Sequence, residues 1–137
     1  MTTQRNHFAV FLGLALALVT GCGKKGPPEA YVTGKVTIGG QPPSSPVLVN
    51  YSDSMNGQFG MSPTRPDGSY DLVMPLKPGN YVVSFDKPSE GDGPIGTSAK
   101  GLTLVPPEYR TEDKSPLKQE VKEGKNVINL EVPGPKS

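Results

Sequence analysis

Frequent interruption of the chain by glycine and proline is the feature that most restricts its fold. The 137 residues include 17 Gly and 16 Pro, roughly twice the usual share of these two residues. Both residues weaken helices, so the distribution argues against a helical bundle. Two alternatives remain, a disordered low-complexity chain or a small all-β domain rich in turns. The net charge of +1 also argues against a nucleic-acid-binding protein, which would need a basic surface.

Short segments with alternating apolar and polar residues favour the all-β alternative. Three of them place apolar residues on one face: Val32, Val36 and Ile38; Tyr70, Leu72 and Met74; and Tyr81, Val83 and Phe85. Further strands are expected at 47–51, 58–62, 101–105, 117–122 and 127–132, the last two joined into a hairpin by the turn at 123–126. Essentially no helix is expected, because no apolar stripe has helical spacing. Seven or so strands predict one β-sandwich over residues 31–132.

Residues 1–21 are organised like a secretory signal peptide. A polar start with Arg5 precedes an apolar run of 12 residues at 8–19, which is too short to span ~30 Å of hydrocarbon. Thr20, Gly21 and Cys22 follow and resemble a bacterial lipobox. The resemblance implies cleavage between Gly21 and Cys22, and attachment of diacylglycerol and acyl chains such as palmitate to Cys22. Two or more acyl chains anchor a protein stably without a transmembrane helix. The alternative is an ordinary secreted protein with a cysteine near its cleavage site.

Lipidation of Cys22 fits the rest of the chain. Cys22 is the only cysteine, so no intramolecular disulfide can form. Residues 22–30 are expected to form a flexible tether, and residues 133–137 a disordered tail. Gly23 stands where an Asp, in proteobacterial lipoproteins, favours retention in the inner membrane. The resemblance therefore implies a lipid-anchored protein of the bacterial cell envelope, on the outer membrane or a periplasm-facing membrane rather than in the cytoplasm.

Three motifs in the central region occur in the order typical of one family. Residues 34–42 read GKVTIGGQP, residues 64–72 read TRPDGSYDL and residues 78–83 read PGNYVV. Together they resemble the carboxypeptidase regulatory-like domain, which implies a transthyretin-like (prealbumin-like, Ig-like) β-sandwich with a structural or accessory role. The remainder, with PPEY at 106–109, SPLKQEV at 115–121 and GKN at 124–126, is similar to small lipoproteins of planctomycete-type bacteria.

The turns in these motifs have a physical explanation. Asp67 is expected to bond its own turn amides while Gly68 takes a positive φ. Pro78 sets one angle of a second turn, and Gly79 is expected to supply the other. These four residues are therefore interpreted as structural.

The mature chain lacks the residues of common catalytic and metal sites. The only histidine, His7, lies in the signal peptide, and a lipidated Cys22 is no free thiol, which argues against His- or Cys-dependent catalysis and His/Cys metal sites. Asp86, Glu90 and Asp92 in DKPSEGDG are candidate oxygen ligands for Ca²⁺, or carboxylates for glycoside hydrolysis. Their spacing matches no full EF-hand loop, and acidic loops of this kind are usually solvated. No resident cofactor is expected.

Two features of the sequence each allow two interpretations. Tyr70 and Tyr81 either close the core with their hydroxyls at its rim or serve as a ligand platform. Residues 109–114 (YRTEDK) are either an interaction surface or a solvated loop. The sequence predicts a non-catalytic structural or binding module that is anchored to a membrane and has an envelope protein or a glycan as its partner. A carboxylate-dependent hydrolase and a Ca²⁺-dependent adhesion module are the alternatives.

Overall fold

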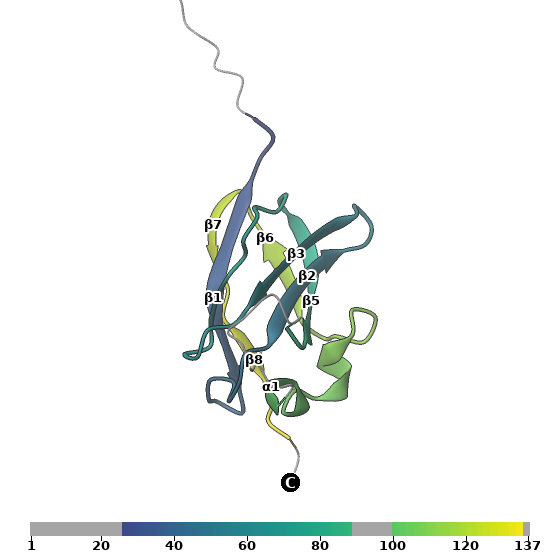
Figure 1. Cartoon of the computed structure of the whole chain (residues 1–137). Helices are drawn as coiled ribbons and strands as arrows, with labels where there is room; N and C mark the ends of the chain where they lie inside the picture. Colours follow the sequence, from purple (N-terminus) through teal and green to yellow (C-terminus); the bar gives the residue numbers. More distant parts are fainter. Residues whose placement is uncertain (1–25, 89–99, 136–137) are drawn as a thin grey trace, which may run out of the picture.

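Two stacked β-sheets form the structure (Figure 1). The computed structural model describes residues 26–88 and 100–135. The first sheet contains β4 (Ser69–Asp71), β1 (Ala30–Ile38), β7 (Gly124–Val127) and β8 (Leu130–Val132). The second has the order β3 (Gln58–Pro63), β2 (Leu48–Asp53), β5 (Gly79–Asp86) and β6 (Lys118–Val121). Two single-turn helices, α1 (Lys100–Thr103) and the 3₁₀ helix η1 (Pro107–Arg110), lie between β5 and β6 in the sequence. The predicted all-β sandwich is confirmed.

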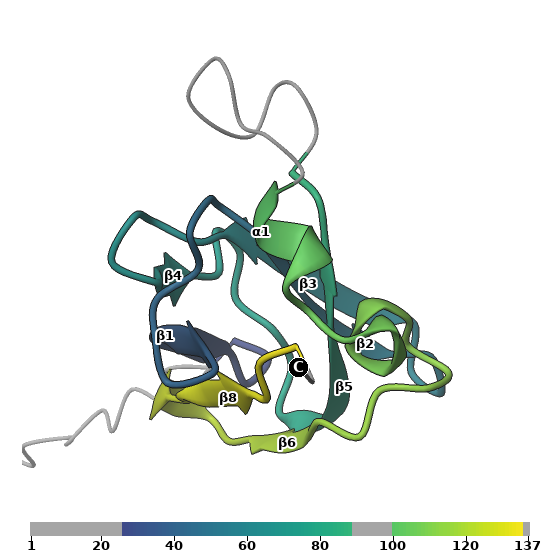
Figure 2. The ribbon, with the colours of Figure 1, turned by 90° about the horizontal axis from the view of Figure 1, so that it is seen from below.

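The apolar core lies between the two sheets, which face each other in Figure 2. The alternating residues of β1 and β5 point into it, as predicted, and are buried: Val32, Val36, Ile38, Tyr81, Val83 and Phe85. Val49 and Tyr51 of β2 fill the space between these strands. Complete burial of one such side chain contributes about 1.5–3 kcal/mol. The alternation that identified these strands in the sequence is therefore also what holds the two sheets together.

Three buried tyrosines connect the sheets. The ring centroid of Tyr51 lies 6.3 Å from that of Tyr70 and 6.2 Å from that of Tyr81. The Tyr70 hydroxyl donates to the carbonyl of Ile128 at 2.7 Å, so in its 2.8 Å bond with Tyr51 the Tyr51 hydroxyl must be the donor. The Tyr70 hydroxyl thus lies inside the fold rather than at the rim of the core. The Tyr81 hydroxyl donates to the carbonyl of Lys77. Both hydroxyls are engaged within the domain.

The C-terminal strands β7 and β8 run parallel to β1 and are interrupted at Ile128 and Asn129. The Asn129 side chain accepts the hydrogen bond of the Lys35 backbone N–H at 3.1 Å, in place of a backbone carbonyl. The Ile128 carbonyl lies at this interruption of the ladder and accepts the hydrogen bond of the Tyr70 hydroxyl. A Cβ on Gly34 would lie only 1.8 Å from that carbonyl oxygen. Glycine is therefore required at position 34 by close approach of the backbone.

The hairpin predicted for residues 117–132 is wrong. β6 pairs antiparallel with β5 in the second sheet, whereas β7 and β8 pair with β1 in the first. Residues 122–123 cross from one sheet to the other, and Gly124 accommodates the crossing with a φ of 88°. The alternation within each strand is the same for a hairpin and for a crossover, because it records which face is buried and not which strand is the neighbour.

The strand predicted at 101–105 is also wrong, because this segment forms α1 and a turn. The amides of Leu104 and Val105 donate to the carbonyls of Gly101 and Leu102. A Cβ on Gly101 would lie 2.3 Å from the carbonyl oxygen of Ser45, so the helix rests directly on the β1–β2 connection. Neither α1 nor η1 has the length and apolar character needed to cross a bilayer, and the described ranges contain no other helix.

Two details of the predicted turns need correction, and one is confirmed. Met74 does not share the buried face of Tyr70 and Leu72 but is 73% exposed, since the chain has left the ladder with β1 at that point. Gly79 does not have a positive φ; it is the first residue of β5. The Asp67–Gly68 turn forms as predicted: Gly68 has a φ of 81°, and the Asp67 carboxylate accepts the Ser69 amide at 3.0 Å.

Candidate functional site: a proline-lined groove

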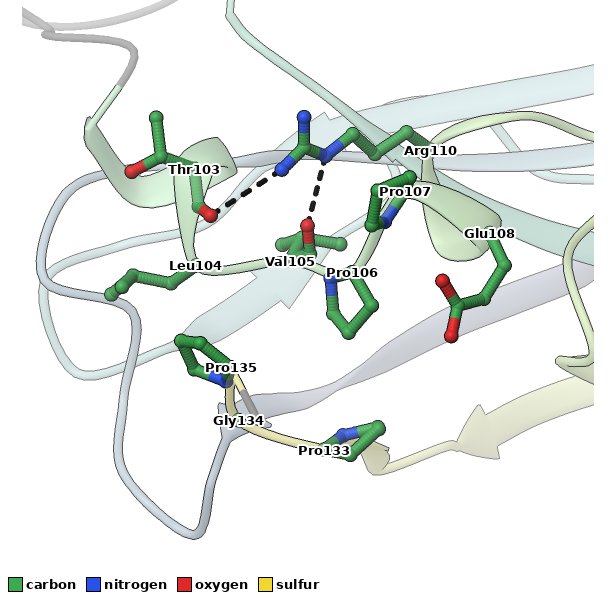
Figure 3. A pocket seen from close by; sticks show the side chains of 10 residues that line it. All are labelled: Thr103, Leu104, Val105, Pro106, Pro107, Glu108, Arg110, Pro133, Gly134 and Pro135. Atoms are coloured by element: carbon green, nitrogen blue, oxygen red, sulfur yellow. Dashed lines mark hydrogen bonds between the residues drawn. The ribbon is translucent and has the colours of Figure 1, made fainter. Parts of the chain in front are cut away.

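A groove of about 510 Å³ opens at the end of the sandwich where β1 and β8 finish. Its walls come from the segment that joins α1 to η1 and from the residues after β8. Figure 3 shows Leu104 and Pro106 on one side, Pro133 and Pro135 across from them, and the Glu108 carboxylate beside Pro106. The groove is thus built from two segments that are about 25 residues apart in the sequence.

The α1–η1 wall is held by one buried anchor and one charged side chain. Val105 is fully buried in the core. The Arg110 side chain folds back, donating from Nε to the Val105 carbonyl at 2.8 Å and from Nη2 to the Thr103 carbonyl at 3.3 Å. Hydrogen bonds from a charged donor are among the stronger ones in proteins. Arg110 therefore positions the wall and directs its guanidinium to the backbone rather than into the groove (Figure 3).

The opposite wall continues from β8 across the β1–β2 turn. The Gly39 amide donates to the Val132 carbonyl at 2.8 Å, and a Cβ on Gly134 would lie 3.3 Å from the Cα of Gly39. Close approach of two glycines brings Pro133 and Pro135 over the end of the sheet. These residues fall within the segment for which the sequence predicts a disordered tail, yet in the structure they line the groove.

The groove offers a mainly apolar lining and one exposed carboxylate. Proline rings and Leu104 provide an apolar lining, and Glu108 is an exposed carboxylate beside it. The Nε and Nη2 atoms of Arg110 donate hydrogen bonds to the backbone carbonyls of Val105 and Thr103. Across the part of the chain that the structure describes, no three His, Cys, Asp or Glu side chains gather closely enough to hold a metal ion.

The residues singled out from the sequence do not converge on this groove. Gly21, Cys22, Glu90 and Asp92 lie outside the described residues. Asp86 is exposed at the end of β5 and accepts the Lys87 amide at 2.7 Å. Asp67, Gly68, Pro78 and Gly79 lie in or beside the turns of the sandwich, away from the groove lining.

Residues 109–114 are partly built into the fold. Tyr109 packs against the core, and the Glu112 carboxylate accepts a hydrogen bond from the Ser54 hydroxyl at 2.7 Å. Hydrogen bonds from Ser54 and Ser52 lower the pKa of Glu112. This loop therefore attaches the η1 segment to the β2–β3 turn, and the groove lies beside it.

Sequence reasoning missed the groove because no local signal shows that its two walls meet. Pro106 and Pro107 read as a break between strands, and the prolines near the C-terminus read as a tail. In comparisons with known proteins, no family model and no curated protein matches this chain.

Proposed function

We propose that this chain is a lipid-anchored, non-catalytic binding module of the bacterial cell envelope, and that its groove receives an extended segment of another envelope protein. The proposal rests on the position of the groove relative to the point where the chain enters β1. The lipobox-like Cys22 lies eight residues before β1, and the groove lies at the opposite end of that strand. A nine-residue strand spans roughly 30 Å at ~3.3 Å per residue. A domain anchored in this way presents its groove away from the membrane.

An extended protein segment fits the groove better than a glycan does. A sugar needs several hydrogen-bonding groups, whereas this lining is mainly proline and Leu104. Ligand sites of this kind take apolar side chains and use a few polar groups for orientation. Glu108 is the group that would favour a lysine or arginine on the partner. The resemblance to the carboxypeptidase regulatory-like domain and to planctomycete-type lipoproteins supports an accessory role of this kind.

Removal of the thiol tests the anchor. The Cys22→Ala variant is expected to leave the membrane fraction or to accumulate as the uncleaved precursor, because no acyl chain can be attached. Lys24→Ala is the matched control, since it changes a nearby residue and keeps the thiol. A processed Cys22→Ala protein that still fractionates with membranes as completely as the Lys24→Ala protein would contradict the anchoring proposal.

Site-specific cross-linking in cells tests the groove. A photoreactive residue at Thr103, which is exposed and lines the groove, is expected to yield a discrete adduct with an envelope protein. The same residue at Lys114, which is exposed outside the groove, serves as the control. Glu108→Lys is expected to abolish the Thr103 adduct by charge reversal. An adduct pattern that is the same from both positions, or is unchanged by Glu108→Lys, counts against the groove as the binding site.

A further inference from the structure

The end of the sandwich where the chain enters β1 carries most of the exposed apolar side chains. We call it the tether end and define it by residues 29–31, the β2–β3 turn (54–57), the β4–β5 connection (72–78) and residues 122–125 of the β6–β7 crossing. Among the described residues seven large apolar side chains are exposed, and four lie here: Tyr31 (49%), Met55 (96%), Val73 (83%) and Met74 (73%). The other three lie along β3 and β7.

Strand register places these segments at one end of the molecule. Ala30, the first residue of β1, is bridged to Leu76 and paired with Gly124. Gly79, the first residue of β5, pairs with Val121, the last residue of β6. The β2–β3 turn adjoins them, since a Cβ on Gly79 would lie 3.5 Å from the Asp53 carboxylate. Figure 1 shows the β1 start, the β2–β3 turn and the β6–β7 crossing together at the top of the domain.

Exposed lysines lie at the same end as these apolar side chains. Lys77, Lys122 and Lys125 are exposed at the tether end, and Lys24 and Lys25 follow Cys22 in the sequence. Two glutamates, Glu29 and Glu123, also lie here, and the Glu29 carboxylate accepts a hydrogen bond from the Tyr31 hydroxyl at 2.7 Å. The Glu112 carboxylate also lies at this end, because it accepts the hydrogen bond of the Ser54 hydroxyl. The three exposed lysines are therefore matched in number by glutamates, two of which accept hydrogen bonds from neighbouring hydroxyls. Exposed apolar side chains beside exposed lysines are the chemistry of a surface that binds anionic lipid headgroups.

We propose that the tether end docks on the bilayer that holds the lipid of Cys22, with Met74, Val73 and Met55 at the headgroup level and the lysines on anionic phosphates. This inference rests on the proposed function, because it requires the anchor. Seven residues separate Cys22 from Ala30, so the tether holds the domain within roughly 30 Å of the surface. Because the domain is already held at the surface, docking is an intramolecular step. A contact that is too weak to bring a free domain to the membrane is then strong enough to keep the tethered domain docked.

Spin labels in the lipidated full-length chain test the docking directly. The protein is reconstituted in vesicles of phosphatidylethanolamine and phosphatidylglycerol, and one label is placed at Met74→Cys or at Gln41→Cys. Gln41 is exposed and bridged to Ile38 at the other end of β1. Lipidation blocks the only native thiol, so each label is unique. We expect the Met74 label near the headgroup–acyl boundary, roughly 5–10 Å deep, with several-fold lower accessibility to a water-soluble nickel complex than the Gln41 label.

Charge reversal gives the matched comparison. Lys122→Glu with Lys125→Glu is expected to return the Met74 label to water. Arg65→Glu with Lys87→Glu changes the net charge by the same amount at the other end of the sandwich, where Pro63 and Asp86 pair with Leu48, and is expected to leave the label immersed. Vesicles of phosphatidylcholine alone are expected to reproduce the effect of the first pair, because they present no anionic headgroup.

The possible outcomes separate this inference from the proposed function. Partition of the purified protein into the detergent phase establishes the lipid; a protein without it overturns both proposals. A lipidated protein whose Met74 label is as accessible as its Gln41 label overturns the docking alone and leaves the anchor standing. Dipolar coupling between two Met74 labels would mean that a second copy of this chain covers the tether end, and immersion of both label positions would mean that the domain lies flat. Either result overturns end-on docking.

Discussion

The Tyr70 hydroxyl accepts one hydrogen bond from the Tyr51 hydroxyl and donates one to the carbonyl of Ile128. Tyr70→Phe therefore leaves two buried polar groups without this partner, whereas Tyr51→Phe removes only a donor to Tyr70. A buried polar group that loses its partner costs about 1–3 kcal/mol. We expect Tyr70→Phe to lower the free energy of unfolding by an amount in this range and Tyr51→Phe by less. Urea denaturation of both variants measures the difference; equal losses would contradict the assigned direction of the bonds.

The same pair makes the fold sensitive to high pH. Burial raises the pKa of Tyr51 to about 12 and also raises the pKa of Tyr70, whereas an unfolded tyrosine has a pKa of ~10. Stability from these groups is complete below pH 10 and is lost as the pH rises toward 12, because only the unfolded chain then releases the protons. The loss is about 1.4 kcal/mol per pH unit for each such group.

Denaturant titrations between pH 8 and pH 11.5 measure this dependence, with absorbance at 295 nm reporting tyrosinate. Tyr51→Phe is expected to reduce the slope above pH 10. If the wild-type unfolding free energy stays level through this range, the two hydroxyls are not protected from solvent in the way that the structure indicates.

Gly34 tests the close approach of the backbone beside Tyr70. Gly34→Ala places a Cβ where the Ile128 carbonyl oxygen lies, so β1 must move away from the C-terminal strands. Overpacking of this kind costs about 1–3 kcal/mol and occasionally more, and we expect a loss at the upper end of that range. Gly26→Ala is the control, since nothing lies within 4 Å of the point that a Cβ on Gly26 would occupy. Thermal unfolding separates the two, and similar melting temperatures would refute the argument.

At the scale of elements, the crossing from β6 to β7 depends on Asn126. Its side-chain oxygen accepts the Lys122 amide at 2.9 Å, and its nitrogen donates to the carbonyls of Lys122 and Gly124 at 2.7 and 3.1 Å. These bonds hold the chain as it leaves one sheet and joins the other. Asparagine is suited to this position because it offers a donor and an acceptor on one short side chain.

Asn126→Ala is therefore expected to lower the free energy of unfolding by about 1–3 kcal/mol. Lys125→Ala, an exposed neighbour in the same strand, is expected to change it by no more than ~0.5 kcal/mol. Chemical denaturation of the two variants provides the comparison. An Asn126→Ala protein as stable as the Lys125→Ala protein would show that the crossing is held by backbone pairing alone.

The elements themselves were largely predictable, because burial of one face leaves a period of two in the sequence. Val32, Val36 and Ile38 identify β1, and Tyr81 identifies the buried face of β5 in the same way. The partners of the strands were not predictable. β6 and β7 follow each other with a turn-like Gly124 between them, yet they belong to different sheets, and no local residue pattern encodes that choice.

At the scale of the whole molecule, the structure assigns different surfaces to the two ends of β1. The end at Ala30 carries exposed apolar residues and lysines, and the other end carries the groove. The sequence predicts a lipid anchor because a lipobox-like segment is contiguous. It did not indicate the groove, because Pro106 and Pro133 come together only when α1 and the end of β8 are in place. The exposed apolar surface at the tether end could not be predicted either. The alternating pattern suggests that Met74 is a core residue, but β4 ends at Asp71.

The proposed anchor is tested most directly by the intact mass of the protein extracted from the membranes of a bacterium that processes lipoproteins. We predict a chain that begins at Cys22 and carries the added mass of a diacylglyceryl group and an acyl chain, with both additions confined to the N-terminal peptide. An unmodified chain, or one that begins at another residue, would contradict the anchor on which the assignment of the two ends depends.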